Sequence, residues 1–258
     1  MNTKIISDSA ISIINQYKNF QVGNAVCSVP YYNNKVKGVR GGLRVEVGKG
    51  SPKEIYEEVK MILIKEKVAE TEINSEQLKK TLVDNNIGID CSGFAYYILN
   101  EESKSRGKGS LDKHIHFIRA KNILAKFVAR FKPEANVDVV TFADNKNSRI
   151  VPLEQVECGD MITMASSTNN GERNHILIIS QIEYQNFKPI TLHYVHAVTW
   201  PTDGEYGHGI HEGRIEIIDT NKSLTEQRWV ENDKTGPENY TATRAQNSQT
   251  ELRRLAFL

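Results

Sequence analysis

The order of hydrophobic patterns along the chain predicts an α+β fold, with helices in the first half and a mostly antiparallel sheet in the second. Apolar residues recur at helical spacing through 6–17, and the pattern returns after Ser51 and after Cys91. Beyond Asn136 the apolar runs are short and are separated by Asn, Gly, Pro and Asp, which is typical of strands and turns. Helices followed by strands indicate an α+β domain, in which the helix that begins at Cys91 packs on the sheet.

Five segments have the apolar spacing or the capping residues of a helix. The clearest start is Ser51-Pro52-Lys53-Glu54, a capping box with proline in the first turn. The Gly-Lys-Gly-Ser run that precedes it lacks the spacing of a phosphate-binding loop, so we interpret it as part of the helix cap. Further helices are predicted over 6–17, 75–82, 91–99 and 123–131.

Strands are predicted where short runs alternate or are rich in β-branched residues. One short strand is expected over 43–47, ahead of the main sheet. The main sheet is expected to take strands from 137–142, 160–165, 175–182, 190–198 and 209–218, and a last edge strand from 252–258. The polar stretch between 220 and 250 gives no clear element.

Composition limits the classes of partner. The 258 residues carry 33 basic and 32 acidic side chains, a formal net charge of +1, which gives no electrostatic reason to expect nucleic acid or an anionic membrane as a partner. No apolar run resembles a secretory signal or spans a bilayer, so we expect a cytoplasmic protein, delivery by a non-classical route, or a trimmed leader. Three scattered cysteines predict neither a disulfide framework nor a metal knuckle.

The strongest candidate for chemistry is Cys91, within Gly88-Ile89-Asp90-Cys91-Ser92-Gly93-Phe94. A polar, turn-prone run leads into this cysteine, and the helix pattern starts with it. Unpaired N–H groups and the helix dipole stabilise negative charge at such a position, which favours a nucleophilic thiolate. Asp90 or Ser92 is expected to cap the same turn.

Two histidines in the strand-rich half supply the partners that a cysteine nucleophile needs. His175 begins one predicted strand, and His196 lies about one hairpin later. His175 is suited to be the imidazole that shuttles the proton, and His196 is suited to be the third polar group that orients this imidazole. His193 and His196 point to opposite faces of a strand and cannot share a metal ion, and no metal site or cofactor is predicted. His208 and His211 are expected in a glycine-rich loop.

The motifs resemble the NlpC-type cell-wall cysteine peptidases, a compact papain-like family. The resemblance rests on the motif around Cys91, on Gly159-Asp160-Met161-Ile162, on His175 at the start of a strand, and on Tyr194-Val195-His196-Ala197. A weaker match is Pro30-Tyr31-Tyr32, after an N-terminal helix. The chain departs from the family pattern at Cys158, where proline is usual, and at Leu177, where glycine is usual.

The resemblance implies a single papain-like domain over 1–258, with an insertion at about 33–86. It implies Cys91 as nucleophile, His175 as general base and acid, and His196 as the orienting residue, with His193 as the alternative for that last role. Tyr31, Tyr32, Asp90 and Ser92 are expected to contact substrate.

The activity implied is hydrolysis of an amide bond through a Cys91 thioester. By resemblance the substrate is a peptidoglycan stem peptide, cut next to D-Glu or meso-diaminopimelate. Two alternatives remain open at this stage: an acyltransferase or deamidase that uses the same three residues, and a non-catalytic binding module of the same fold. The oligomeric state is left open.

Overall fold

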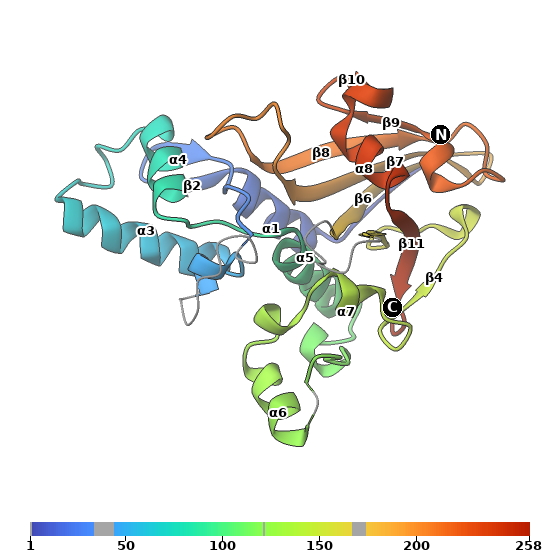
Figure 1. Ribbon diagram of the computed structural model, residues 1–258, viewed down its shortest axis with the longest axis horizontal. Helices are drawn as coiled ribbons and strands as arrows, with labels where there is room; N and C mark the ends of the chain where they lie inside the picture. The colour runs from blue at the N-terminus through green and yellow to red at the C-terminus, as the bar shows by residue number, and fades with distance from the viewer. Residues whose placement is uncertain (1, 34–43, 121, 167–173) are drawn as a thin grey trace.

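The computed structural model describes residues 2–33, 44–120, 122–166 and 174–258 and confirms a mixed α+β fold with a mostly antiparallel sheet (Figure 1). The helices of the first half lie against one large sheet, which the second half forms together with the N-terminal strand. Residues from both halves share one hydrophobic core, which runs from Ile6 to Leu255.

The sheet has nine strands among the described residues, and each recorded strand pairing in it is antiparallel. A separate small hairpin pairs β2 (Phe20–Val22) with β3 (Ala25–Cys27). In the main sheet, β1 (Asn2–Ile5) pairs with β6 but is not part of the linear order of the other eight strands. In this order each strand is hydrogen-bonded to the next: β10 (Lys234–Thr235), β9 (Arg228–Glu231), β8 (Gly209–Glu216), β7 (Lys188–Val198), β6 (His175–Gln185), β5 (Met161–Ala165), β11 (Gln249–Leu255) and β4 (Ser148–Ile150).

The helices begin where the sequence provides caps. The capping box at Ser51 is present in full, with Glu54 reaching back to the Ser51 backbone. The α-helices are α1 (Asp8–Lys18), α3 (Pro52–Glu66), α4 (Ser75–Asp84), α5 (Cys91–Ser105), α6 (Ile123–Phe131), α7 (Val139–Ala143) and α8 (Tyr240–Gln246). The 3-10 turns are η1 (Arg44–Val47), η2 (Leu111–Lys113), η3 (Glu134–Asn136), η4 (Leu153–Gln155), η5 (Leu224–Glu226) and η6 (Gly236–Glu238). None of the helices within these residues has the length and apolar character needed to cross a bilayer.

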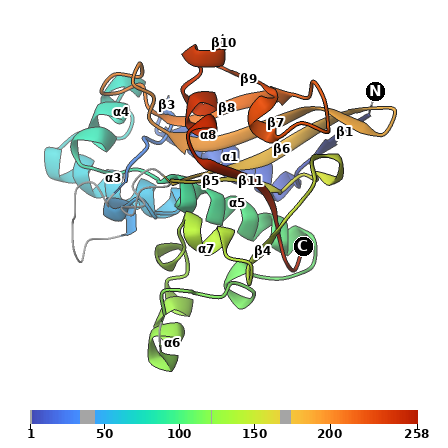
Figure 2. The ribbon, with the colours of Figure 1, turned by 45° about the vertical axis from the view of Figure 1, so that its right-hand side comes forward.

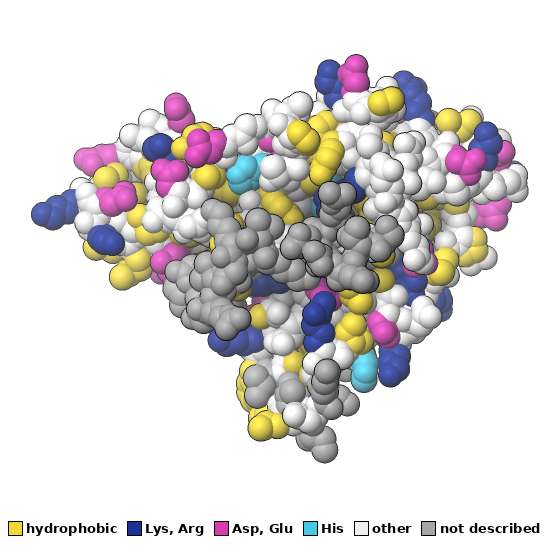
Figure 3. All heavy atoms as spheres, viewed as in Figure 1, with side chains coloured by type: hydrophobic (Ala, Val, Ile, Leu, Met, Phe, Trp, Pro, Cys, Tyr) yellow, Lys and Arg dark blue, Asp and Glu magenta, His cyan; other side chains and the backbone are white. Residues whose placement is uncertain are grey.

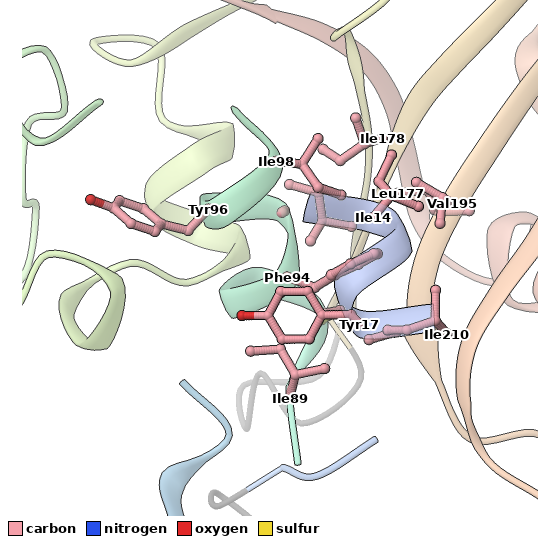
Figure 4. Packing of buried hydrophobic residues seen from close by; sticks show 14 of the residues in the cluster. Ile14, Tyr17, Ile89, Phe94, Tyr96, Ile98, Leu177, Ile178, Val195 and Ile210 are labelled. Carbon is pink, nitrogen blue, oxygen red and sulfur yellow. The ribbon is translucent and has the colours of Figure 1, made fainter. Parts of the chain in front are cut away.

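The helix α5 is the centre of the core. It packs against α1 and against β6 and β7, as the turned view in Figure 2 shows. Phe94 of α5 meets Tyr17 of α1 edge to face, with ring centroids 5.4 Å apart. Figure 4 shows the same ring beside Leu177 and Val195 of the sheet. Because α5 is buried almost all round, its first residue is held in a fixed position relative to the strands.

Two predicted strands are wrong. Residues 44–47 form the 3-10 helix η1, and most of 137–142 forms the short helix α7. In α7 the Asp138 side chain accepts a hydrogen bond from the Thr141 backbone N–H. A good cap followed by buried Val139 and Phe142 outweighs the strand preference of the two valines.

The polar stretch between 220 and 250 contains β9, β10 and α8, which the sequence did not reveal. Asn232 and Asp233 adopt φ of 50° and 56° and form the turn between β9 and β10. The last strand, β11, is not an edge strand as expected, because it lies between β5 and β4. Its Arg254 forms a buried ion pair with Asp160, which allows a charged residue inside the sheet.

Candidate active site

Cys91 is the first residue of α5 and is only 6% exposed. Asp90 caps the helix, and its Oδ1 accepts a hydrogen bond of 2.6 Å from the Gly93 backbone N–H. Gly93 is required here, because a Cβ at this position would lie 2.8 Å from the Gly48 carbonyl oxygen. The turn that carries Cys91 is therefore pressed against a neighbouring backbone segment.

That neighbouring segment supplies a buried cation. The Lys49 ammonium, 7% exposed, donates to Asp90 Oδ1 at 2.9 Å, to Ser92 Oγ at 2.7 Å and to the Val137 carbonyl at 3.1 Å. All three donor sites of the ammonium are used, so the charge is paired and its hydrogen bonds are satisfied. Lys49 thereby holds Asp90 and Ser92, the residues before and after Cys91, in fixed positions.

The Pro30–Tyr32 segment runs alongside the approach to Cys91. The Tyr32 N–H donates to the Ile89 carbonyl at 3.1 Å, and the Ile89 N–H donates to the Pro30 carbonyl at 3.0 Å. Burial is the largest cause that raises the pKa of the Tyr31 phenol. The charge of the nearby Cys91 is the second largest. The structure thus brings Tyr31 to the thiol, while Tyr32 is buried at 7% exposed.

On the sheet side, His175 and His196 form a buried pair. His175 Nε2 lies 2.6 Å from His196 Nδ1, and the two side chains are 0% and 1% exposed. His175 begins β6 and His196 lies near the end of β7, its neighbour in the sheet. The hydrogen bond joins two adjacent antiparallel strands.

Glu231 of β9 completes the polar cluster. Its carboxylate lies 3.2 Å from His196 Nε2, accepts a 2.8 Å hydrogen bond from the Tyr194 hydroxyl, and lies 3.0 Å from His211 Nδ1. Burial acts to raise the pKa of Glu231, but His196, His211 and Tyr194 together hold that pKa well below its ordinary value. Glu231 is therefore ionised and accepts from all three neighbours.

This carboxylate fixes where the protons of the two imidazoles lie. An ionised Glu231 can only accept, so His196 carries its proton on Nε2 and has a lone pair on Nδ1. That lone pair accepts the proton of His175 Nε2, which leaves His175 Nδ1 as a lone pair. His175 Nδ1 is also one of the buried polar atoms that have no hydrogen-bond partner among the described residues. Such an atom is an unused proton acceptor inside the protein.

The thiol lies beside the strand that carries this acceptor. Cys91 interacts with the backbone N–H of Ile176, the residue after His175, and this contact helps to lower the thiol pKa. Arg244 of α8 donates to the carbonyl of Asn174, the residue before His175, at 3.3 Å. Its charge acts on both groups, lowering the pKa of the thiol and that of the imidazole.

Burial decides the resting protonation of the pair. It raises the pKa of the Cys91 thiol to about 11, with the Asp90 charge adding to the effect, and outweighs Arg244 and Lys49. It also lowers the pKa of His175 well below its ordinary value. The expected thiolate at the helix N-terminus is therefore wrong for this buried state, because desolvation exceeds the favourable charges. At rest, the Cys91 thiol and the His175 imidazole are therefore both neutral.

The other predicted site residues are placed differently. His193 points away from this cluster and bonds to Glu183 Oε1 at 2.8 Å, so it is not the residue that holds His175. Asp90 and Ser92, expected to contact substrate, instead bond to each other and to Lys49 in the helix cap. Their role in the structure is to position the turn that carries Cys91.

A metal was not expected, yet three ligand-type side chains meet in this cluster. His196, His211 and Glu231 place their ligand atoms within 4.8 Å of one another. His211 lies in β8, directly opposite His196 in the strand register, as the strand predicted over 209–218 requires, so the loop expected around His208 and His211 does not include His211. The same atoms are joined by the hydrogen bonds described above, so a metal ion would have to replace the bonds that orient His196.

Sequence reasoning missed Glu231, Lys49 and Arg244. Glu231 had a detectable signal, since a run of Trp, Val and Glu before an Asn-Asp turn is typical of a strand in a hairpin. Lys49 and Arg244 gave none, because each reaches the site only through tertiary contacts.

No protein-family model matches this chain, and no curated protein or solved structure is significantly similar to it. Its function is therefore inferred from the geometry of the site and from the sequence motifs.

Proposed function

We propose that the chain is a papain-like cysteine amidase or peptidase of the NlpC type. The observation that carries this proposal is the buried chain Glu231–His196–His175. Within 2–33, 44–120, 122–166 and 174–258, it leaves His175 Nδ1 without a hydrogen-bond partner, on the strand that meets Cys91. A packing role for the histidines gives no reason to leave one imidazole nitrogen unpaired in the protein interior, since such an atom costs free energy.

The first half of the reaction forms a thioester. His175 Nδ1 takes the Cys91 thiol proton as the sulfur attacks the amide carbonyl carbon, so that no free thiolate is needed beforehand. The negative charge moves to the carbonyl oxygen, where the backbone N–H of Cys91 at the start of α5 stabilises it. The amine then leaves with the proton from His175, and an acyl-Cys91 thioester remains.

The second half releases the acid. A water molecule gives its proton to His175 Nδ1 and attacks the thioester carbonyl, and the sulfur leaves and regains a proton from His175. During each half the positive charge on His175 is stabilised through His196 by the Glu231 carboxylate. The products are a free carboxylate and a free amine.

The motifs around Cys91 and His196 favour a peptidoglycan stem peptide as substrate. A D-Glu or meso-diaminopimelate residue carries a free carboxylate close to the scissile amide. The positive charge of Arg244 next to the thiol and His175 suits such an acidic substrate.

The test is incubation of purified protein with defined muropeptides, followed by mass spectrometry of the products. We expect paired fragments with a new amine and a new carboxyl end, formed by wild type and by Cys27→Ala, but not by Cys91→Ala. Fragments that appear equally with Cys91→Ala would contradict the proposal. Transfer of the acyl group to an added amine without hydrolysis would instead favour the acyltransferase.

A further inference from the structure

The helix α6 exposes its apolar side chains. Leu124, Phe127 and Phe131 are 72%, 59% and 66% exposed, and they lie at spacings of three and four residues, on one face. Ala129, which lies on the opposite face, is 1% exposed and forms part of the core. In Figures 1 and 2, α6 lies at the lower tip of the molecule, away from the sheet, and Figure 3 shows apolar side chains on that tip.

The segment around α6 is also strongly basic. From Phe117 to Pro133 the sequence has five cations and no acidic residue: Arg119, Lys121, Lys126, Arg130 and Lys132. Arg119 forms an ion pair with Asp138, whereas Arg130 and Lys132 are exposed at the C-terminal end of the helix. The net charge of +1 for the whole chain conceals this local concentration.

A second helix in the same chain makes the contrast clear. On α3, Met61 and Ile64 are 62% and 61% exposed, so exposed apolar residues also occur there. The α3 sequence, however, mixes three lysines with four glutamates. Exposed apolar residues are ordinary on protein surfaces. The unusual feature of α6 is that an apolar face is combined with a segment, 117–133, that carries five cations and no acidic residue.

We propose that α6 is an interfacial helix that binds the surface of an anionic lipid bilayer. The apolar face of Leu124, Phe127 and Phe131 enters the boundary between headgroups and acyl chains, and the exposed Arg130 and Lys132 contact the lipid phosphates. At nine residues the helix lies on the membrane and does not cross it. This assignment revises the expectation, drawn from the net charge, that no membrane is involved, and it does not depend on the proposed enzymatic activity.

The test is co-sedimentation of the full chain with vesicles of phosphatidylglycerol and phosphatidylcholine, or of phosphatidylcholine alone, at low salt. We expect binding to the anionic vesicles only, weakened by added salt. The double variant Leu124→Ser/Phe127→Ser is expected to bind roughly tenfold more weakly or worse, because it removes most of the buried apolar area. Arg130→Glu is expected to weaken binding to anionic vesicles as well. The matched control Met61→Ser/Ile64→Ser on α3 should bind like wild type.

Three results would overturn the proposal. The first is equal binding to both vesicle types, or to neither. The second is an equal loss in the α3 and α6 variants, which would show that α6 is not the contact. The third is salt-sensitive binding to double-stranded DNA without vesicle binding, which would identify a polyanion partner. Circular dichroism of each variant confirms that the fold is retained.

Discussion

The two sides of the candidate active site hold their reactive atoms in different ways. On the helix side, Lys49, Asp90 and Ser92 bond to one another and to the backbone, so that the Lys49 ammonium has three acceptors and the Gly93 N–H is capped by Asp90. On the sheet side, the chain from Glu231 through His196 ends at a nitrogen of His175 that has no hydrogen-bond partner in the part of the chain that the structure describes. The helix side holds Cys91 in position, and the sheet side provides the proton acceptor that the proposed mechanism uses.

The contrast explains why burial acts differently on the two reactive groups. Burial keeps the proton on the Cys91 thiol and keeps it off His175 Nδ1. In the resting state the Cys91 thiol is therefore a proton donor and His175 Nδ1 is a proton acceptor. In the proposed mechanism the proton moves only when an electrophile approaches the sulfur, so the resting protein does not expose a reactive thiolate.

The largest effect is expected at the nucleophile. Cys91→Ala should lower kcat/KM on a cleavable muropeptide by a factor on the order of 10⁴ or more, because no other described side chain can form the thioester. The change removes one sulfur at the start of α5, so the thermal midpoint should change little. The matched control is Cys158→Ala, a buried cysteine outside the site, which should keep its activity. An equal loss in both variants would contradict the assignment of Cys91.

Glu231→Gln tests the sheet side. A glutamine amide can donate a hydrogen bond to His196 Nε2. His196 then carries its proton on Nδ1 and donates to His175 Nε2, so His175 carries its own proton on Nδ1. We expect kcat/KM to fall by about 1000-fold with a smaller change in KM, since the base is lost while the geometry is retained. The matched control is Glu183→Gln, whose carboxylate bonds to His193 on the other face. Full activity of Glu231→Gln would remove Glu231 from the mechanism.

Lys49→Met tests the helix side, where a structural effect should dominate. Removal of the ammonium leaves the partly exposed Asp90 carboxylate without its cation and the Ser92 hydroxyl and Val137 carbonyl without their donor, so we expect the free energy of unfolding to fall by about 2 kcal/mol, measured by urea denaturation. Lys53→Met, at an exposed position on α3, is the control and should change it by less than about 0.5 kcal/mol. A stability of Lys49→Met equal to that of the control would show that the cluster does not hold the cap.

The smallest effect is expected from weakly acidic pH. His175 accepts a proton only while neutral, and its pKa is lowered by burial below the ordinary value of about 6.5. The neutral form therefore persists as the pH falls through 6.5, and kcat/KM should stay level until the pH reaches the lowered pKa. An acid limb at or above pH 6.5, with the fold intact by circular dichroism, would contradict the buried neutral imidazole.

Local sequence signals were enough to predict the five longer helices and the central strands of the sheet, but not the short helices α7 and α8. The capping box at Ser51 and the strand patterns at 175–182 and 190–198 depend on neighbouring residues, and the structure has these elements. The strand predicted over 137–142 failed because the Asp138 cap competes locally with the valines. The position of β11 inside the sheet could not be predicted, since strand order depends on long-range pairing.

The candidate site was predictable only in part. Cys91, His175 and His196 stand in motifs, so their residue types and spacing identified them. Glu231 and Lys49 reach the site from segments more than 30 residues away, and only tertiary contacts bring them there. The raised pKa of Cys91 could not be predicted either, because burial is a property of the packed fold.

The most direct test of the account is the protonation of the two imidazoles, read by nitrogen-15 NMR of histidine-labelled protein at neutral pH. We predict that His175 and His196 both carry their protons on Nε2 and that His175 Nδ1 has the chemical shift of an unprotonated nitrogen. In Glu231→Gln the His175 proton should move to Nδ1. A proton on His175 Nδ1 in the wild type would contradict the claim that Glu231 prepares this atom to accept the Cys91 proton.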